Sequence, residues 1–268
     1  MSPALPIPKY HQVYLVLREQ LADGRYAEGV PGELQLTKAF GVARVTVRRA
    51  LDRLVAEGLI ARRPGRGTVA LTPPSPSRHG PGAGHLEGAN GAQFSGLLEN
   101  IVSMGLATTV RVIECTQMPA PAAVAQPLEL APGAPVQKAV RVRSTREGPL
   151  SHITTYVPAA LASGFGRREL AAKPLLLLLE EAGVRIGRAS QSISARLADA
   201  EVAARLAVDV GSALLAVSRL VRDEHDRPVQ WLQGLYRPDR YEYRMQLSRV
   251  GAIDAKLWVS DALTAQFH

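Results

Sequence analysis

The chain has 268 residues, of which 46% are hydrophobic, 21% are charged and 5% are aromatic. This length and apolar share fit two packed domains and exclude global disorder. The single cysteine, Cys115, excludes a disulfide framework and a cysteine-based zinc site. No apolar run approaches the roughly 20 residues that cross a bilayer, and the N-terminus has no signal-peptide pattern. We therefore expect a soluble, cytoplasmic protein with no membrane partner.

The net charge of +8 is concentrated near the N-terminus. Residues 1–78 carry 12 Lys and Arg against 6 Asp and Glu, whereas residues 79–268 carry 20 against 18. A basic excess on the scale of one domain indicates a polyanionic partner, because each neutralised phosphate releases counterions. A basic but merely soluble domain would show the same sum, so the arrangement of the charges has to distinguish the two.

Residues 1–71 have the pattern of a winged helix-turn-helix. Helical apolar spacing predicts a first helix within 10–21, a short second helix within 31–41 and a third helix over 44–57. Two short strands, 59–63 and 68–71, flank a Pro-Gly-Arg-Gly turn and form the wing.

The third helix of this domain begins with basic side chains. Side chains in the first turn of such a helix reach base edges in the major groove, where arginine grips guanine and threonine meets phosphate or a thymine methyl group. Wing arginines supply charge, and wing glycines allow the backbone to approach DNA. The predicted DNA-binding residues are Arg44, Thr46, Arg48, Arg49, Arg62, Gly65, Arg66 and Gly67.

A Pro- and Gly-rich stretch, 72–92, is predicted to link this domain to a second one over 93–250, with a C-terminal tail at 251–268. The second domain has an α+β pattern, an antiparallel sheet with helices packed on it. Its predicted strands are 109–116, 136–145, 150–157, 189–197, 213–222, 229–236 and 241–248, and its predicted helices are 167–172, 175–182 and 200–206.

The second domain also contains a weak internal repeat. A shift of 78 residues aligns six identical residues, among them Arg141 with Arg219, and both copies continue into two strands, the second ending near Tyr156 or Tyr236. Chance identity in an Ala-, Leu- and Val-rich sequence is the alternative. If the repeat is a duplication, the two halves of the sheet meet along a seam, which is a natural place for a pocket.

The first domain resembles the DNA-binding domain of GntR-family transcription regulators. The resemblance rests on the Pro-x-Glu entry to the second helix, the Arg-x-Thr-Val-Arg-x-Ala-Leu stretch and the Gly-x-Gly-Thr wing. Three positions depart from the family pattern: Gly32 and Ala43 replace Ser or Thr, and Leu34 stands where an arginine is frequent. These departures imply fewer phosphate or base contacts at the helix entries and leave the fold intact.

The second domain, from about Gln93 to Arg249, is similar to the UTRA ligand-sensing domain of the HutC-type branch, which has a chorismate-lyase-like fold. The residues that carry this similarity are Arg141-Val-Arg143, Gly148-Pro149-Leu150, Tyr156-Val-Pro158, Ala189-Ser-Gln191-Ser-Ile193-Ser-Ala195, Asp226-Arg-Pro228 and Tyr236-Arg-Pro-Asp239-Arg-Tyr241-Glu-Tyr243. The resemblance implies a small polar or anionic effector at the Arg-x-Arg strand. The predicted effector-binding residues are Arg141, Arg143, Thr154, Tyr156, Gln230 and Tyr236.

Two features limit what this similarity implies. Relatives that bind amino sugars tend to carry Glu where this chain has Ile153, so the identity of the ligand does not transfer. Surface or salt-bridging roles for Arg141 and Arg143 remain an alternative to effector binding.

Catalytic patterns are missing from the sequence. The six histidines have no metal-ligand spacing, and neither a nucleophile elbow nor a phosphate-binding loop occurs. We therefore predict a homodimeric transcriptional regulator, expected to act as a repressor on double-stranded operator DNA, and neither an enzyme nor a protein that needs a metal or cofactor. Two alternatives stay open: a chorismate-lyase-like enzyme fused to a DNA-binding domain, and a DNA binder without a ligand.

Overall fold

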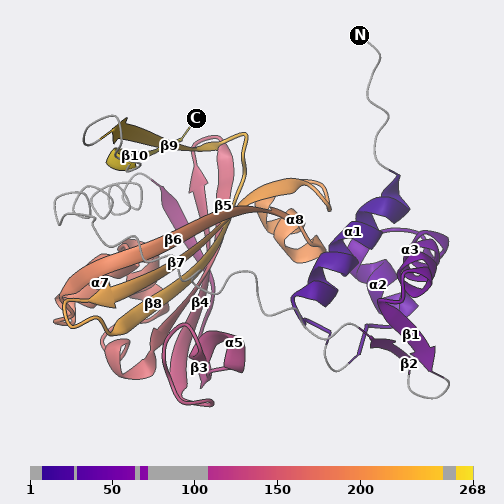
Figure 1. The fold of residues 1–268 in the computed structure, drawn as a ribbon, viewed down its shortest axis with the longest axis horizontal. Coiled ribbons are helices and arrows are strands. Elements are labelled where there is room, and N and C mark those ends of the chain that lie inside the picture. The colour runs from indigo at the N-terminus through magenta and orange to yellow at the C-terminus, as the bar shows by residue number, and fades with distance from the viewer. Residues whose placement is uncertain (1–7, 27–28, 64–66, 72–107, 250–257, 268) are drawn as a thin grey trace, which may run out of the picture. The chain divides into compact units, whose positions relative to one another are not determined.

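The structure, a computed structural model, describes residues 8–26, 29–63, 67–71, 108–249 and 258–267 (Figure 1). The chain divides into two compact units. The first consists of residues 1–80 and 195–214, and the second of residues 81–194 and 215–268. The predicted linker, 72–92, lies outside the described residues.

The first unit is a winged helix-turn-helix, as the sequence predicts. Three helices precede a two-stranded antiparallel wing in which Ile60 faces Ala70 and Arg63 faces Gly67. The elements are α1 (Lys9–Ala22), α2 (Glu33–Phe40), α3 (Arg44–Ala56), β1 (Ile60–Arg63) and β2 (Gly67–Ala70).

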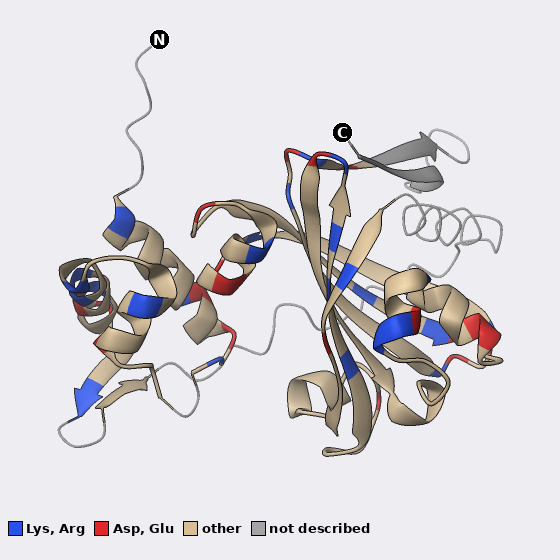
Figure 2. Ribbon diagram, turned by 180° about the vertical axis from the view of Figure 1, so that it is seen from behind, with Lys and Arg blue, Asp and Glu red and all other residues tan. Residues whose placement is uncertain are grey.

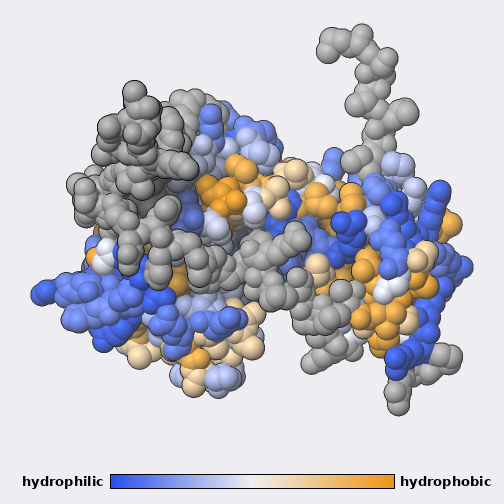
Figure 3. All heavy atoms as spheres, viewed as in Figure 1, coloured by the Kyte–Doolittle hydropathy of each residue, from blue (hydrophilic) through white to orange (hydrophobic). Residues whose placement is uncertain are grey.

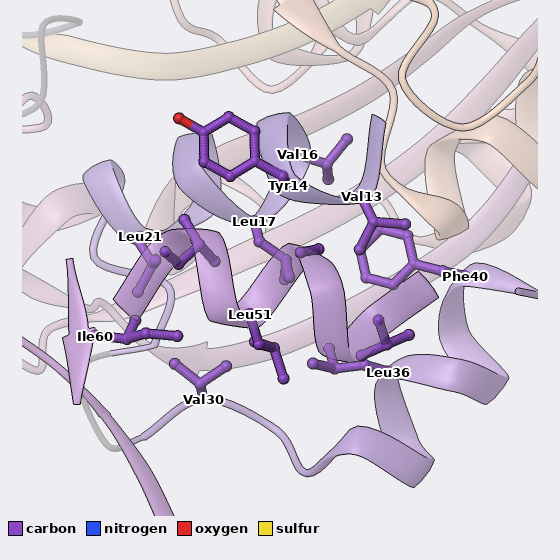
Figure 4. Close-up of a cluster of buried hydrophobic side chains, with 13 residues drawn as sticks. Val13, Tyr14, Val16, Leu17, Leu21, Val30, Leu36, Phe40, Leu51 and Ile60 are labelled. Carbon is purple, nitrogen blue, oxygen red and sulfur yellow. The ribbon is translucent and has the colours of Figure 1, made fainter. Parts of the chain in front are cut away.

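One apolar cluster holds these helices together (Figure 4). Helical spacing directs Val13 and Leu17 of α1 and Leu51 of α3 into it, where each is at most 2% exposed. Tyr14 is buried in the same cluster, and its hydroxyl donates to the Glu57 carboxylate at 2.7 Å. The first unit therefore has a core of its own, which fixes the orientation of α3.

Residues 195–214 belong to the first unit by their contacts, although the sequence assigns them to the second domain. They include α8 (Ala200–Leu206), whose N-cap Asp199 forms an ion pair with Arg25 at 2.6 Å. Glu19 of α1 accepts the backbone N–H of Leu197 at 3.0 Å and pairs with Arg196 at 3.3 Å. These contacts group the segment with α1.

The second unit is built on a six-stranded antiparallel sheet with strand order β3-β4-β5-β8-β7-β6. This confirms the predicted α+β class. Its elements are β3 (Thr109–Pro119), α5 (Ala122–Ala125), β4 (Pro135–Thr145), β5 (Gly148–Pro158), the short helix η1 (Ala159–Leu161), α6 (Arg167–Ala172), α7 (Leu175–Glu181), β6 (Ile186–Leu197), β7 (Ala213–Asp223), β8 (Pro228–Tyr236), β9 (Tyr241–Arg249) and β10 (Trp258–Phe267). The end of β6 and the start of β7 fall within residues 195–214 and so are grouped with the first unit.

The last two strands form a separate antiparallel pair, in which Phe267 of β10 faces Tyr241 of β9. The sequence predicts a tail over 251–268, and the structure instead places a strand there. Pairing with β9 supplies backbone hydrogen bonds that a single-sequence pattern does not reveal.

The strand order supports an internal duplication. Elements β3-α5-β4-β5 and β6-α8-β7-β8 follow one another in the same order, and the two halves of the sheet meet where β5 pairs with β8. Local conformation repeats at the same offset of 78 residues: Glu129 and Ala207 both have a φ of 53°, and Gly133 and Gly211 have φ of 80° and 83°. Element order and local conformation thus both support a duplication, and the two halves meet at the β5–β8 pairing.

Helices cover parts of both sheet faces. Helices α6 and α7 pack against a face that presents Ala139, Val157 and Val221. Helix α5 packs against the opposite face, which presents Val136 and Trp231. Because side chains alternate along a strand, these residues identify the face to which their strand neighbours belong, up to the next bulge.

Candidate DNA-binding surface and effector site

Two arginines in the first turns of α3 are held by one carboxylate from α2. Glu33 accepts Nε of Arg44 at 2.8 Å and Nη2 of Arg48 at 3.0 Å. Arg44 and Arg48 lie on one helix face because they are four residues apart. Hydrogen bonds from Arg48 and Arg44 lower the pKa of Glu33 to about 2, so the carboxylate stays charged and keeps both arginines in place.

Both arginines remain accessible to a partner. Their side chains are 59% and 54% exposed. Figure 2 shows basic residues along α3 and at the end of β1, and hydrophilic side chains cover this outer edge of the first unit in Figure 3. An exposed basic helix end beside a basic wing is the arrangement with which winged helices meet DNA.

The other predicted residues of α3 have different surroundings. Thr46 is half-buried. The guanidinium of Arg49 lies 4.0 Å from the centre of the Tyr10 ring, so Arg49 faces α1 and does not join the Glu33 cluster. Arg49 is exposed and reaches solvent beside that ring.

The wing residues are described only in part. Arg62 pairs with Asp52 of α3 at 2.6 Å and its side chain is 50% exposed. Gly67 has a φ of +73°, a backbone conformation that side chains rarely adopt. Gly65 and Arg66 lie outside the described residues.

Neither α2 nor α3 has a side-chain oxygen at its N-cap. The N-cap residues are Gly32 and Ala43. At Gly32 the side chain of Gln35 compensates in part by making the reciprocal bond of a capping box, in which its Oε1 accepts the N–H of Gly32 itself at 3.2 Å. Ala43 has no such compensation among the described residues.

Two apolar side chains are exposed next to these N-caps. Leu34 is 64% exposed and Val45 is 72% exposed. The sequence marks Leu34 only as a departure from the family pattern, and it does not single out Val45. The position of Val45 as the second residue of a helix that begins with Arg44 was the signal that could have identified it. An apolar side chain at that position can contact thymine methyl groups, which is a form of base readout.

In the second unit, the sheet face that carries Arg141, Arg143 and Arg219 is called here the arginine face. The register places Arg141 opposite Ile153 on β5, and Arg219 opposite Leu232 on β8. The arginine face includes Arg141, Arg143, Ser151, Ile153, Thr155, Gln230, Leu232, Gly234, Tyr236 and Arg219.

Arg141 is a buried cation with unused hydrogen-bond donors. It is 2% exposed, and its Nη2 donates to Thr155 Oγ1 at 3.4 Å. Its Nε and Nη1 have no hydrogen-bond partner among the described residues. Burial, and then the charge of Arg143, lower the pKa of Arg141 to about 9. Orphaned buried donors are costly, so this arrangement fits a site that an anionic acceptor completes.

The structure brings four of the six predicted effector residues to this face and separates two. Gln230 and Tyr236 share the face of Arg141 and Arg143, and the buried Oε1 of Gln230 has no partner among the described residues. Thr154 and Tyr156 point to the opposite face, where Tyr156 stacks on Trp231 with ring centroids 5.7 Å apart.

A one-residue difference between the repeats explains this separation. The register matches β5 to β8 with an offset of 79 residues, whereas β4 matches β7 with an offset of 78. Tyr156 therefore corresponds to Leu235 and not to Tyr236, since a shift of one residue moves a side chain to the other face. The sequence alignment paired the two tyrosines without that shift.

Sequence reasoning aligned Arg219 with Arg141 but did not include it in the site. Arg219 is 6% exposed and lies on the same face. Ser151 was also missed, and its buried Oγ has no partner among the described residues. The internal repeat was the signal for Arg219; nothing in the sequence distinguished Ser151.

No group of three or more His, Cys, Asp or Glu side chains in the described part of the chain could hold a metal ion. Within the same residues, no helix is both long and apolar enough to span a membrane.

A winged helix-turn-helix with exposed arginines on its third helix, joined to a separate α+β unit, defines the class of two-domain DNA-binding regulators. The chain belongs to the GntR family of bacterial regulatory proteins, whose characteristic domain matches residues 9–69, and residues 103–242 match the UTRA domain. The predicted family and domain pairing are confirmed.

Two transcriptional repressors are similar to this chain over most of their length. The repressor NagR of Bacillus subtilis is 26% identical over 247 residues, covering 91% of this chain and 97% of its own. The repressor PhnF of Mycolicibacterium smegmatis is 29% identical over 234 residues, covering 87% and 90%. A crystal structure assigned as a ligand-binding domain of a GntR-family regulator from Bordetella bronchiseptica is 35% identical, with a TM-score of 0.50, and covers 53% of this chain and 91% of that domain.

Proposed function

We propose that this GntR-family regulator is a homodimeric repressor whose affinity for operator DNA changes when a small anionic effector binds on the arginine face. The observation that carries the effector part is Arg141, a buried guanidinium with two donors that no described residue accepts. A carboxylate or phosphate would supply both the acceptors and the missing negative charge.

The DNA-binding part rests on the cluster of Glu33, Arg44 and Arg48. We assign Arg44 and Arg48 to base readout, with Thr46 beside them, and Arg62 and Arg66 to phosphate contacts. Arg49, stacked on Tyr10, acts as a phosphate contact at most. A single winged helix offers few base contacts, so selection against a genome of competitors favours a symmetric dimer on a near-palindromic site.

The effector set is Arg141 and Arg143 with Ser151, Thr155, Gln230 and Tyr236 around them. Thr154 and Tyr156 leave the set because they lie on the other face. This revised set keeps the polar groups of one face together, as a single ligand requires.

A thermal-shift screen of anionic metabolites tests this proposal, because a ligand of the native state raises apparent stability by RT ln(1 + [L]/Kd). Each ligand found is then titrated into the protein with and without operator DNA. The proposal predicts stabilisation that Arg141→Gln removes and an altered operator affinity. Effector affinity that is unchanged in Arg141→Gln would place the ligand elsewhere. A ligand turned over into product would favour the lyase-like alternative.

A further inference from the structure

The duplication gives Arg219 the same position in the second half of the sheet as Arg141 has in the first. The two residues are 78 positions apart, and each lies one strand away from the β5–β8 seam, Arg141 next to β5 and Arg219 next to β8. A two-fold rotation about an axis at the β5–β8 seam exchanges the positions of the two arginines in the sheet. A second buried arginine at a symmetry-related position is therefore part of the architecture of this face.

Arg219 is buried without a counter-ion in the described part of the chain. Its Nε and Nη2 both donate to the uncharged Gln191 Oε1, at 2.8 and 2.5 Å. Burial lowers the pKa of Arg219, and the nearby phenols of Tyr236, Tyr241 and Tyr243 offset part of this effect. Tyr236 and Tyr241 pack together with ring centroids 4.4 Å apart. These neighbours orient a guanidinium without neutralising it.

A second observation points to a ligand at the same place. Gln230, diagonal to Arg219 on β8, is 3% exposed, and its Oε1 has no hydrogen-bond partner among the described residues. The seam relates Gln230 to Ser151, which is diagonal to Arg141 and has an equally orphaned Oγ. Each half of the sheet thus presents one buried arginine and one buried polar group with unused hydrogen-bonding capacity.

We propose that Arg219, with Gln191 and Gln230, is a second anion-binding anchor, so that the effector is an elongated molecule with an anionic group at each end. This inference rests on the proposed function, which supplies the first anchor at Arg141. Each anionic end neutralises one buried guanidinium, and Gln230 Oε1 accepts a hydroxyl or amine hydrogen of the ligand.

The geometry limits the middle of this molecule. Three strand spacings and a two-residue offset separate the Cα atoms of Arg141 and Arg219 by roughly 16 Å. The positions between them on this face carry uncharged residues, including Ile153, Thr155 and Gly234. At Gly234 a Cβ would lie 2.6 Å from the Tyr236 ring, so glycine is what allows that ring to lie across the strand. An uncharged spacer therefore fits between the two anionic ends.

The test compares dianions with matched monoanions by calorimetric titration of the full-length protein. The panel is the unbranched dicarboxylates of four to eight carbons and glucarate, with the corresponding monocarboxylates and gluconate. We expect at least one dianion to bind ten-fold or more tightly than its monoanion. Arg219→Gln should remove that advantage, lowering the affinity for the dianion more than the affinity for the monoanion.

Arg222→Gln is the matched control, because Arg222 also lies on β7 and already pairs with Glu129 at 2.5 Å. It should keep the dianion advantage, and thermal unfolding checks that both variants fold. A panel without any dianion advantage, or an equal loss for both ligand types in Arg219→Gln, overturns the second anchor. If monoanions still bind and their binding depends on Arg141, the proposed function is supported even though the second anchor is not. If no monoanion binding depends on Arg141, the result counts against the proposed function as well.

Discussion

Ala43 leaves the helix that carries the proposed DNA-binding arginines without a side-chain N-cap. It occupies the N-cap of α3 and offers no side-chain acceptor to the first-turn N–H groups. Ala43→Ser is expected to raise the free energy of unfolding of the first unit by about 1 kcal/mol, measured by urea denaturation. Gly32→Ser is the control and should gain only a few tenths of a kcal/mol, since glycine is already a tolerable N-cap. Equal gains in both variants would contradict this interpretation.

Glu33 makes the stability of the first unit sensitive to acid. Its pKa is about 2 in the folded chain, below the ordinary value of 4.5, so its pairing stabilises the fold fully above pH 4.5 and is lost as the pH falls towards 2. Glu33→Gln should flatten the pH dependence of unfolding between pH 2 and 4.5. A difference curve between the wild type and the variant, recorded by circular dichroism, should be flat above that window. A difference that changes between pH 6 and 8 would exclude Glu33 as its source.

Arg141 is held charged and buried at a cost to the ligand-free protein. Replacing a buried charge by an apolar side chain of similar length relieves desolvation, so Arg141→Met should raise the free energy of unfolding by about 1 kcal/mol or more. The same variant should lose stabilisation by the anions that bind the wild type. The control Arg222→Met breaks the ion pair with Glu129 and should bring no gain. A destabilised Arg141→Met would contradict the interpretation of Arg141 as a buried charge without a counter-ion.

At the scale of elements, α3 and the wing are expected to act differently on DNA. Arg48→Ala should cost roughly 1–3 kcal/mol of operator affinity and relax base preference if Arg48 reads guanine. Arg66→Ala should weaken binding to all sequences and reduce the salt slope by about one unit. Fluorescence anisotropy at several salt concentrations separates the two effects. Identical effects of both substitutions would contradict the assignment of base readout to α3 and of phosphate contacts to the wing.

The elements were more predictable from the sequence than the site. The predicted bounds of α6 and α8 match the structure, because short amphipathic patterns and their caps are local signals. Strand β10 was missed, since its pairing with β9 is not local. Alternation along the strand correctly placed Arg141 and Arg143 on one face, because that is a property of one strand.

Which residues form the proposed effector site depends on the registers between strands. The one-residue difference between the repeats decides that Tyr236, and not Tyr156, lies on the arginine face. This difference cannot be read from the sequence of one strand alone. The contacts of Arg25 with Asp199 likewise join residues 174 positions apart. Relations of this kind arise only when the chain folds.

At the scale of the whole molecule, residues 195–214 are the expected route of communication. This segment lies between β6 and β7, the strands that carry Gln191 and Arg219, and it contacts α1 through Arg25 and Glu19. A coupling of about 1–3 kcal/mol changes operator affinity on the order of 5- to 150-fold, and operator DNA must change effector affinity by the same factor. Arg25→Gln should reduce this factor while each ligand alone binds as before. An undiminished factor would exclude this route.

Recognition of a near-palindromic operator requires a dimer. Symmetric half-sites on DNA call for two copies of α3 related by a two-fold axis. Light scattering at micromolar concentration should give twice the chain mass of 28.7 kDa. A monomer both with and without operator DNA would contradict this expectation.

Sequence-specific DNA binding through α3 is the central claim, and selection from a random duplex library tests it most directly. The wild-type protein is predicted to enrich a near-palindromic sequence with two half-sites one helical turn or a multiple apart. The Arg44→Ala/Arg48→Ala double variant is predicted to enrich none while remaining folded by circular dichroism. Enrichment of the same sequence by that double variant, or of no sequence by the wild type, would contradict the account.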